Sequence, residues 1–233
     1  MKEKPAFPVH EVFYTFQGEG VHMGRPAFFI RLFGCPVKCP WCDSAGTWHP
    51  DWVPADIKRQ TPDELRQLVQ AHSPSIVVLT GGEPAVHNLD PLVNALSRDD
   101  RMVHLETSGG FPIRGLMDWI TLSPKRWKPP LAANVMLADE FKIIVEKPED
   151  IDFYYTMLIE LGLPPEADNP IWLHPEWSKS SDATVLRAIS DAVKKNTAPF
   201  RAGWQLHKNY RVDLQDPRSR PAVPLGGNPE LGY

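Results

Sequence analysis

The 233-residue chain has only three cysteines and no apolar run long enough to cross a bilayer as a helix. An odd number of cysteines cannot all pair within one chain, and the N-terminal MKEKPAFPVH lacks the apolar core of a signal peptide. We therefore expect a cytoplasmic protein with no membrane contact and with thiols free for metal binding. The formal net charge of −4 argues against a broad surface for nucleic acid or anionic lipid.

No internal repeat is visible, and the length predicts a single domain with a substantial core. The chain has 25 prolines, about twice the average share, which predicts many fixed loops and few long helices. From Asp213 to Tyr233, prolines, glycines and scattered charges replace any periodicity. We expect residues 1–212 to form the domain and residues 213–233 to form a tail that is poorly ordered or docks a partner.

The three cysteines lie within eight residues of one another, in the stretch GCPVKCPWCDSAGTW. Cys35, Cys39 and Cys42 have C-x3-C-x2-C spacing. A four-iron cluster normally takes four thiolates, so three leave one iron open to another ligand. The alternative is a zinc site with His49 as the fourth ligand. The motif favours the iron–sulfur cluster.

This spacing, with the aromatic Trp41 before the last cysteine, resembles the radical S-adenosylmethionine (SAM) superfamily. In that superfamily the amino and carboxylate groups of SAM chelate the open iron. One electron from the cluster then cleaves the sulfonium to a 5′-deoxyadenosyl radical. The resemblance thus implies a 4Fe–4S cluster and SAM as cofactors.

Short apolar runs alternate with helical patterns along the chain. The runs predict six strands, at 26–33, 76–79, 102–106, 119–122, 141–145 and 171–173. The patterns predict helices at 61–71, 90–97, 151–161 and 182–195. The segment 126–139 has no clear helical pattern, and 201–208 is expected to be extended. Strands separated by helices indicate a parallel sheet with right-handed crossovers, and short strands at this spacing favour an α/β partial, TIM-like barrel.

Polar, glycine-rich strings follow several of these strands. They are TGGEP at 80–84, ETSGG at 106–110, SPK at 123–125 and HPEWS at 174–178. Ligands of parallel α/β folds bind at the carboxyl ends of the strands, so all four strings are expected on one rim. This shared position is the strongest physical argument for an enzyme.

Arg31, the adjacent pair Asp43 and Ser44, and Lys142 each allow two interpretations. Arg31 interrupts a buried strand and needs a carboxylate partner, for which we favour a ligand over a structural ion pair. Asp43 and Ser44 present hard oxygens that suit magnesium, although a turn or capping role is equally consistent with the sequence. Lys142 could contact a ligand, but we expect it to lie exposed on its strand.

Taken together, FQGEG at 16–20, FIRLFGCPVKCPWCDS at 29–44, TGGEP, ETSG, SPK and QLHK at 205–208 resemble the 7-carboxy-7-deazaguanine synthase family of queuosine precursor biosynthesis. The match runs from about Val12 to Lys208. It implies a carbon–nitrogen lyase that converts 6-carboxy-5,6,7,8-tetrahydropterin to 7-carboxy-7-deazaguanine. The steps would be hydrogen abstraction at C6, ring contraction and loss of ammonia. The family also implies a homodimer and an electron donor such as flavodoxin or ferredoxin.

The resemblance also assigns roles to individual residues of this sequence. The cluster would be held by Cys35, Cys39 and Cys42, and magnesium by the hydroxyl of Ser44. SAM would be surrounded by Gly82, Glu83, Glu106, Ser108, Ser123, Pro124, Lys125 and His174. The pterin would be bound by Phe16, Gln17, Gly18, Glu19, Arg31, Thr80 and His207.

The sequence departs from the family pattern in three places. His174 stands where relatives often have glutamine, Ser44 replaces a threonine, and the chain beyond Tyr210 is longer than in short members. Two other functions remain open at this point. One is a radical activating enzyme that acts on a protein partner, and the other is a zinc-stabilised binding module without catalysis.

Overall fold

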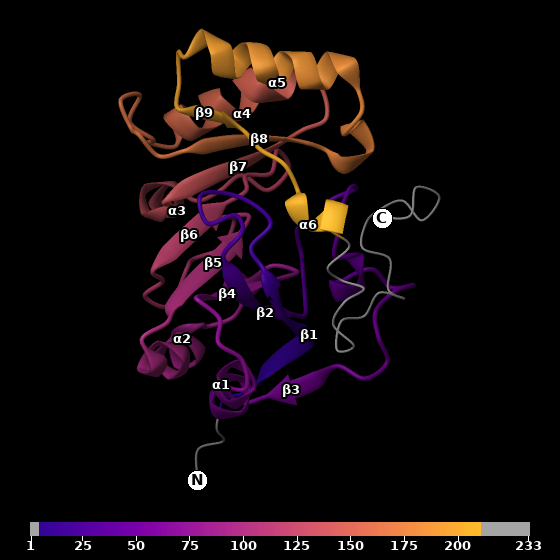
Figure 1. Cartoon of the computed structure of the whole chain (residues 1–233), viewed down its shortest axis with the longest axis vertical. Helices are drawn as coiled ribbons and strands as arrows, with labels where there is room; N and C mark the ends of the chain where they lie inside the picture. The colour runs from indigo at the N-terminus through magenta and orange to yellow at the C-terminus, as the bar shows by residue number, and fades with distance from the viewer. Residues whose placement is uncertain (1–4, 211–233) are drawn as a thin grey trace.

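The computed structural model describes residues 5–210 and consists of one sheet with helices packed along it (Figure 1). The predicted tail at 213–233 lies outside the described residues. Within them, no helix is long and apolar enough to cross a membrane.

Nine strands form the sheet, in the order β3-β1-β2-β4-β5-β6-β7-β8-β9. Their bounds are β1 Phe7–Phe16, β2 Pro26–Leu32, β3 Lys58–Gln60, β4 Ile76–Gly81, β5 Met102–Thr107, β6 Trp119–Leu122, β7 Glu140–Val145, β8 Ile171–Pro175 and β9 Phe200–Ala202. All neighbours from β2 to β9 are parallel, whereas β1 is antiparallel to both β2 and β3. The sheet therefore forms the expected partial, TIM-like barrel, with an antiparallel addition at its first edge.

Six α-helices connect or flank the strands. They are α1 Pro62–Gln70, α2 Asp90–Leu96, α3 Ala132–Leu137, α4 Glu149–Glu160, α5 Ala183–Lys195 and α6 Leu206–Tyr210. The four predicted helices are confirmed to within two residues at each end. The capping box of α1 is formed, because the Glu64 amide donates to Thr61 Oγ1 and the Thr61 amide donates to Glu64 Oε2.

Five elements differ from the sequence-based expectation. β1, β3 and β9 were not among the six predicted strands; β1 has ten residues, and β3 and β9 have three each. α3 forms in the segment without a helical pattern, where the side-chain amide of Asn134 donates to the carbonyls of Gly109 and Phe111. Residues 206–210 are helical rather than extended, and the Leu206 amide donates to the carbonyl of Gly18. Apart from β1, these segments have too few residues for a periodic pattern, so tertiary contacts decide their conformation.

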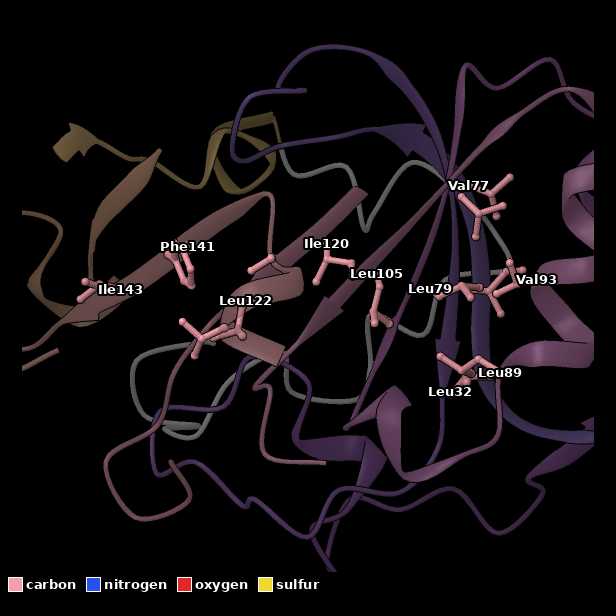
Figure 2. Packing of buried hydrophobic residues seen from close by; sticks show 14 of the residues in the cluster. Leu32, Val77, Leu79, Leu89, Val93, Leu105, Ile120, Leu122, Phe141 and Ile143 are labelled. Atoms are coloured by element: carbon pink, nitrogen blue, oxygen red, sulfur yellow. The ribbon is translucent and has the colours of Figure 1, made fainter. Parts of the chain in front are cut away.

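The main core lies between the outer face of the sheet and the helices. Figure 2 shows this layer, in which Leu79 of β4 points toward Val93 of α2 and Leu105 of β5 follows on the next strand. Side chains alternate along a strand, so the neighbours of these residues point into the barrel. Part of that inner face is also apolar and contains Phe13, Ala27, Phe29, Ile76 and Val78. Nearer the carboxyl ends of the strands, the residues on this face are mostly polar.

The central position of Leu79 gives a stability prediction. Its side chain is fully buried in the main core, so Leu79→Ala should destabilise the protein by about 2–5 kcal/mol through lost burial and a residual cavity. Leu116 is 92% exposed, and Leu116→Ala should change stability by less than about 0.5 kcal/mol. Urea denaturation of both variants measures the difference. Equal losses would show that Leu79 does not belong to a close-packed core.

Candidate active site

A cavity of about 250 Å³ opens at the carboxyl ends of the parallel strands. Its walls come from the cysteine loop, the β1–β2 loop, the ends of β4 to β8 and the start of α6. Most of the residues that the sequence assigned to a site line this one cavity. These are Phe16, Gln17, Gly18, Glu19, Arg31, Cys35, Cys39, Cys42, Ser44, Thr80, Gly82, Glu83, Glu106, Ser108, Ser123, Lys125 and His207. Pro124 and His174 do not line it.

The cysteine loop places three unpaired thiols on one side of the cavity. Burial raises the pKa of all three, that of Cys39 to about 12, so the thiols keep their protons unless a metal displaces them. The indole N–H of Trp48 donates to Cys42 Sγ at 3.3 Å. A Cβ on Gly82 would collide with the carbonyl of Gly34 and with Cys35, so glycine lets this turn pack directly against the cysteine loop.

This donor set fits a cluster better than a single zinc ion. His49 does not line the cavity, since its ring stacks on Trp52 at 4.5 Å and its Nδ1 accepts the amide N–H of Asp51. Across residues 5–210, no three His, Cys, Asp or Glu side chains are close enough to share one metal ion. A cubane offers a separate iron to each thiolate, whereas zinc draws all of its ligands to one atom.

Glu83 closes the turn after β4 with four hydrogen bonds from the protein itself. Its Oε1 accepts from Thr107 Oγ1 at 2.6 Å and from the Ala85 amide at 3.0 Å. Its Oε2 accepts from the amide and the hydroxyl of Ser108, at 2.8 and 2.5 Å. This carboxylate therefore ties the end of β4 to the end of β5 and leaves the backbone at Gly81 and Gly82 facing the cavity.

A second carboxylate joins residues that the sequence placed in two different groups. Glu106 was assigned to SAM, but its Oε1 accepts from Gln17 Nε2 at 3.0 Å and its Oε2 from Thr80 Oγ1 at 3.2 Å. Gln17 in turn accepts the Glu19 amide N–H through its Oε1. The three strand and loop segments therefore form one hydrogen-bonded wall.

Arg31 forms the ion pair that was the alternative in the sequence analysis. Its Nε lies 2.7 Å from Glu11 Oε1, and its guanidinium stands over the ring of Phe13. Glu11 lies on β1, from which the sequence analysis took only Phe16 as a site residue. Contact of Arg31 with a ligand stays a prediction.

Lys142 is half-buried and ion-paired, and the prediction that it lies exposed is wrong. Its Nζ lies 2.5 Å from Glu19 Oε2, and the two side chains are 18% and 9% exposed. The position was misjudged because its partner lies 123 residues away, in the β1–β2 loop. Lys142 interrupts the apolar run FKIIV just as Arg31 interrupts its own strand. A charged residue in an apolar strand indicates an ion-pair partner, so the sequence did contain a signal for this pair.

The remaining predicted residues surround these pairs. Lys125 Nζ donates to the carbonyl and hydroxyl of Ser123, at 2.7 and 2.6 Å, and burial lowers its pKa. The hydroxyl of Ser44 donates to the Gly81 carbonyl at 3.1 Å. His207 packs against Gly18, where a Cβ would meet its ring.

His174 lies behind the cavity wall, although the following residues Pro175, Glu176 and Trp177 line the cavity. Burial lowers the pKa of His174 to about 4, so its ring is neutral at neutral pH. Within the described residues, neither ring nitrogen has a hydrogen-bond partner. Its assignment to SAM stays a prediction.

A three-cysteine loop beside a Gly-Gly-Glu turn, at the rim of a parallel partial barrel, is the arrangement of a radical SAM enzyme. The sequence profile of the Radical SAM superfamily matches residues 29–129. A 7-carboxy-7-deazaguanine synthase of Synechocystis sp. is 45% identical, over 89% of this chain and 94% of the relative. One of Prochlorococcus marinus is 42% identical, over 92% and 91%.

Among solved structures, the crystal structure of QueE from Escherichia coli superposes with a TM-score of 0.73. It has 32% identity and covers 87% of this chain and 95% of that one. The chain belongs to the 7-carboxy-7-deazaguanine synthase family.

The bond from Trp48 to Cys42 makes a prediction for the cluster that these cysteines would hold. Hydrogen bonds to cluster sulfurs stabilise the reduced cluster, which carries more negative charge, and therefore raise the reduction potential. Trp48→Phe removes the donor and should shift the potential to a more negative value in a redox titration followed by electron paramagnetic resonance. The control is Trp52→Phe, because Trp52 contacts the His49 ring as Trp48 does, whereas the hydrogen bond to Cys42 Sγ comes from Trp48. A potential that is unchanged relative to the control would rule out a role for this bond.

Proposed function

We propose that the protein is a radical SAM enzyme that converts 6-carboxy-5,6,7,8-tetrahydropterin to 7-carboxy-7-deazaguanine with loss of ammonia. The observation that supports this most directly is that the three cysteines, most of the SAM-assigned residues and the pterin-assigned residues line one cavity of a family member. We place the enzyme in the cytoplasm, as a homodimer that takes electrons from a flavodoxin or ferredoxin.

In this proposal Cys35, Cys39 and Cys42 hold a 4Fe–4S cluster beside the Gly82 turn. The bound cluster and SAM supply the radical that removes the hydrogen at C6 of the pterin. Gly82, Ser108 and Lys125 line the same cavity as the cysteines and offer backbone and hydroxyl donors and a cation to the carboxylate and ribose of SAM.

Other residues of the cavity lining supply the groups that a pterin needs. The amide and amino edge of the ring requires hydrogen-bond acceptors, which the buried carboxylate of Glu19 provides. The substrate carboxylate requires a cation, for which Arg31 is available through the guanidinium nitrogens that do not bind Glu11. The protein thereby orients the C6 position and excludes water from it, while the cofactors supply the radical chemistry.

An anaerobic turnover assay on reconstituted protein tests the proposal. With the pterin, SAM, magnesium and a reductant, mass spectrometry should detect 7-carboxy-7-deazaguanine, and Cys39→Ala should form none because it cannot hold the cluster. Formation of 5′-deoxyadenosine without product would keep the radical chemistry and overturn the substrate. An iron-free, zinc-loaded protein with neither product would favour the binding module.

We further propose that the hydroxyl of Ser44 would help to hold a magnesium ion, which would supply a cation for the substrate carboxylate. This hydroxyl is buried at the cavity, and the neighbouring carboxylate of Asp43 also faces the cavity. Ser44→Ala should raise the magnesium concentration needed for half-maximal turnover by about 10-fold or more. Ser181→Ala, at an exposed serine, is the matched control. Normal turnover by Ser44→Ala and by metal-free enzyme would exclude this role.

A further inference from the structure

The ion pair of the half-buried Lys142 and the buried Glu19 joins β7 to the β1–β2 loop. Lys142 lies on β7 and Glu19 follows β1, and both side chains line the cavity. In the described residues no other ion pair links this loop to the parallel strands. The pair therefore fixes the position of Glu19 relative to the strand ends.

Stability alone is a poor explanation for this pair. Two charges taken out of water lose much of their hydration, and a well-packed apolar pair in the same volume is often at least as stable. The loop also has other anchors, since the Val21 amide donates to Glu140 Oε2 and the Leu206 amide donates to the Gly18 carbonyl. A buried pair retained at the wall of a cavity is better explained by what it presents to a ligand.

Lys142 uses only one of the two carboxylate oxygens. It contacts Oε2, and within residues 5–210 Oε1 of Glu19 accepts no hydrogen bond. The Glu19 backbone is held separately, because its amide donates to Gln17 Oε1 while Gln17 Nε2 donates to Glu106. Both ends of the residue are thus fixed, and one ionised oxygen is left as an acceptor.

We propose that Lys142 is a positioning residue for substrate recognition, which holds Glu19 ionised and oriented so that Oε1 accepts an N–H of the pterin's pyrimidine edge. This inference rests on the proposed function, since it assigns the ligand of Glu19 to that substrate. Lys142 itself acts through Glu19 and need not touch the pterin.

The electrostatics of the cavity agree with this role. Burial opposes ionisation of Glu19, but Lys142, with smaller contributions from His174 on β8 and His207 on α6, holds the pKa of Glu19 well below its usual range. Burial opposes the charge on Lys142, but the carboxylates of Glu19, Glu106 and Asp43 outweigh it and raise the pKa of Lys142. Without Lys142, burial would dominate at Glu19 and its carboxyl group would take up a proton at a higher pH.

The test measures equilibrium binding of 6-carboxytetrahydropterin under anaerobic conditions. Lys142→Met keeps the length of the side chain but removes its charge, and should weaken binding about 10- to 100-fold, with turnover showing a raised KM rather than a lost kcat. Lys142→Arg should restore most of the affinity. Lys194→Met, which removes an exposed ion pair with Asp191, is the matched control.

The pH profile separates positioning from a structural role. Wild-type affinity should not vary with Glu19 ionisation between pH 6 and 8, whereas Lys142→Met should lose affinity as the pH falls and Glu19 becomes protonated. Glu19→Gln should be weak at every pH in this range, and adding Lys142→Met to it should cost no further affinity.

Three results would overturn the inference. The first is unchanged pterin binding by Lys142→Met, and the second is an identical pH profile in variant and wild type. The third is a parallel loss of pterin binding, SAM binding and thermal stability, which would make Lys142 a structural residue. If the proposed function itself were wrong, the result would differ from these three, because the wild-type protein would neither bind nor turn over the pterin.

Discussion

The pairing of β2 with β4 is the constraint on which the site depends. Their parallel register places Arg31 opposite Thr80 and Leu32 opposite Gly81. The pairing continues past the strands, because the Gly82 amide donates to the Leu32 carbonyl and the Glu83 amide donates to the Gly34 carbonyl. The cysteine loop is thereby fixed against the Gly-Gly turn before any ligand binds, and a side chain at Gly81 or Gly82 would force the two apart. Neighbouring strand ends then add Glu106, Ser123 and Lys142 to the same rim.

The second constraint is the low polarity of the barrel interior. Charged groups there must find partners, and three of them do so across different elements of the sheet: Arg31 with Glu11, Lys142 with Glu19, and Glu83 with the end of β5. These contacts also orient the side chains, so the requirement for a partner and the requirement for a defined binding geometry are met by the same bonds. Chains of such bonds polarise one another in a low-dielectric interior, which favours a single arrangement.

The sequence was sufficient wherever a structural signal is local. The capping box at Thr61 and Glu64, the apolar runs of the strands and the polar strings after them each depend on a few adjacent residues. Together with the cysteine spacing and the family resemblance, they predicted the barrel and about half of the residues that line the cavity. It was insufficient where the partner is distant. Neither the Glu19 partner of Lys142 nor the role of Glu106 as the acceptor from Gln17 and Thr80 can be read from neighbouring residues. α3 and α6 escaped prediction for a related reason, since helices of six and five residues are stabilised mainly by contacts with other segments.

The charge balance of the cavity bears on the ligands it accepts. Among the described residues its lining contains more carboxylates than basic side chains. The carboxylates are Glu11, Glu19, Asp43, Glu83, Glu106 and Glu176, and the Lys and Arg residues are Arg31, Lys125, Lys142 and Lys208. Several of these acids are satisfied by neutral donors rather than by cations, as Glu83 is by Thr107 and Ser108 and Glu176 is by Ser178. Such a cavity retains negative charge that a ligand can offset, and three metal-bound thiolates would add to this negative charge.

Ligands that carry positive charge, such as a sulfonium or a magnesium ion, therefore bind in this cavity with less electrostatic repulsion than anions do. An anionic substrate needs Arg31 or the metal to approach its carboxylate, and this requirement favours one orientation of the substrate in the cavity.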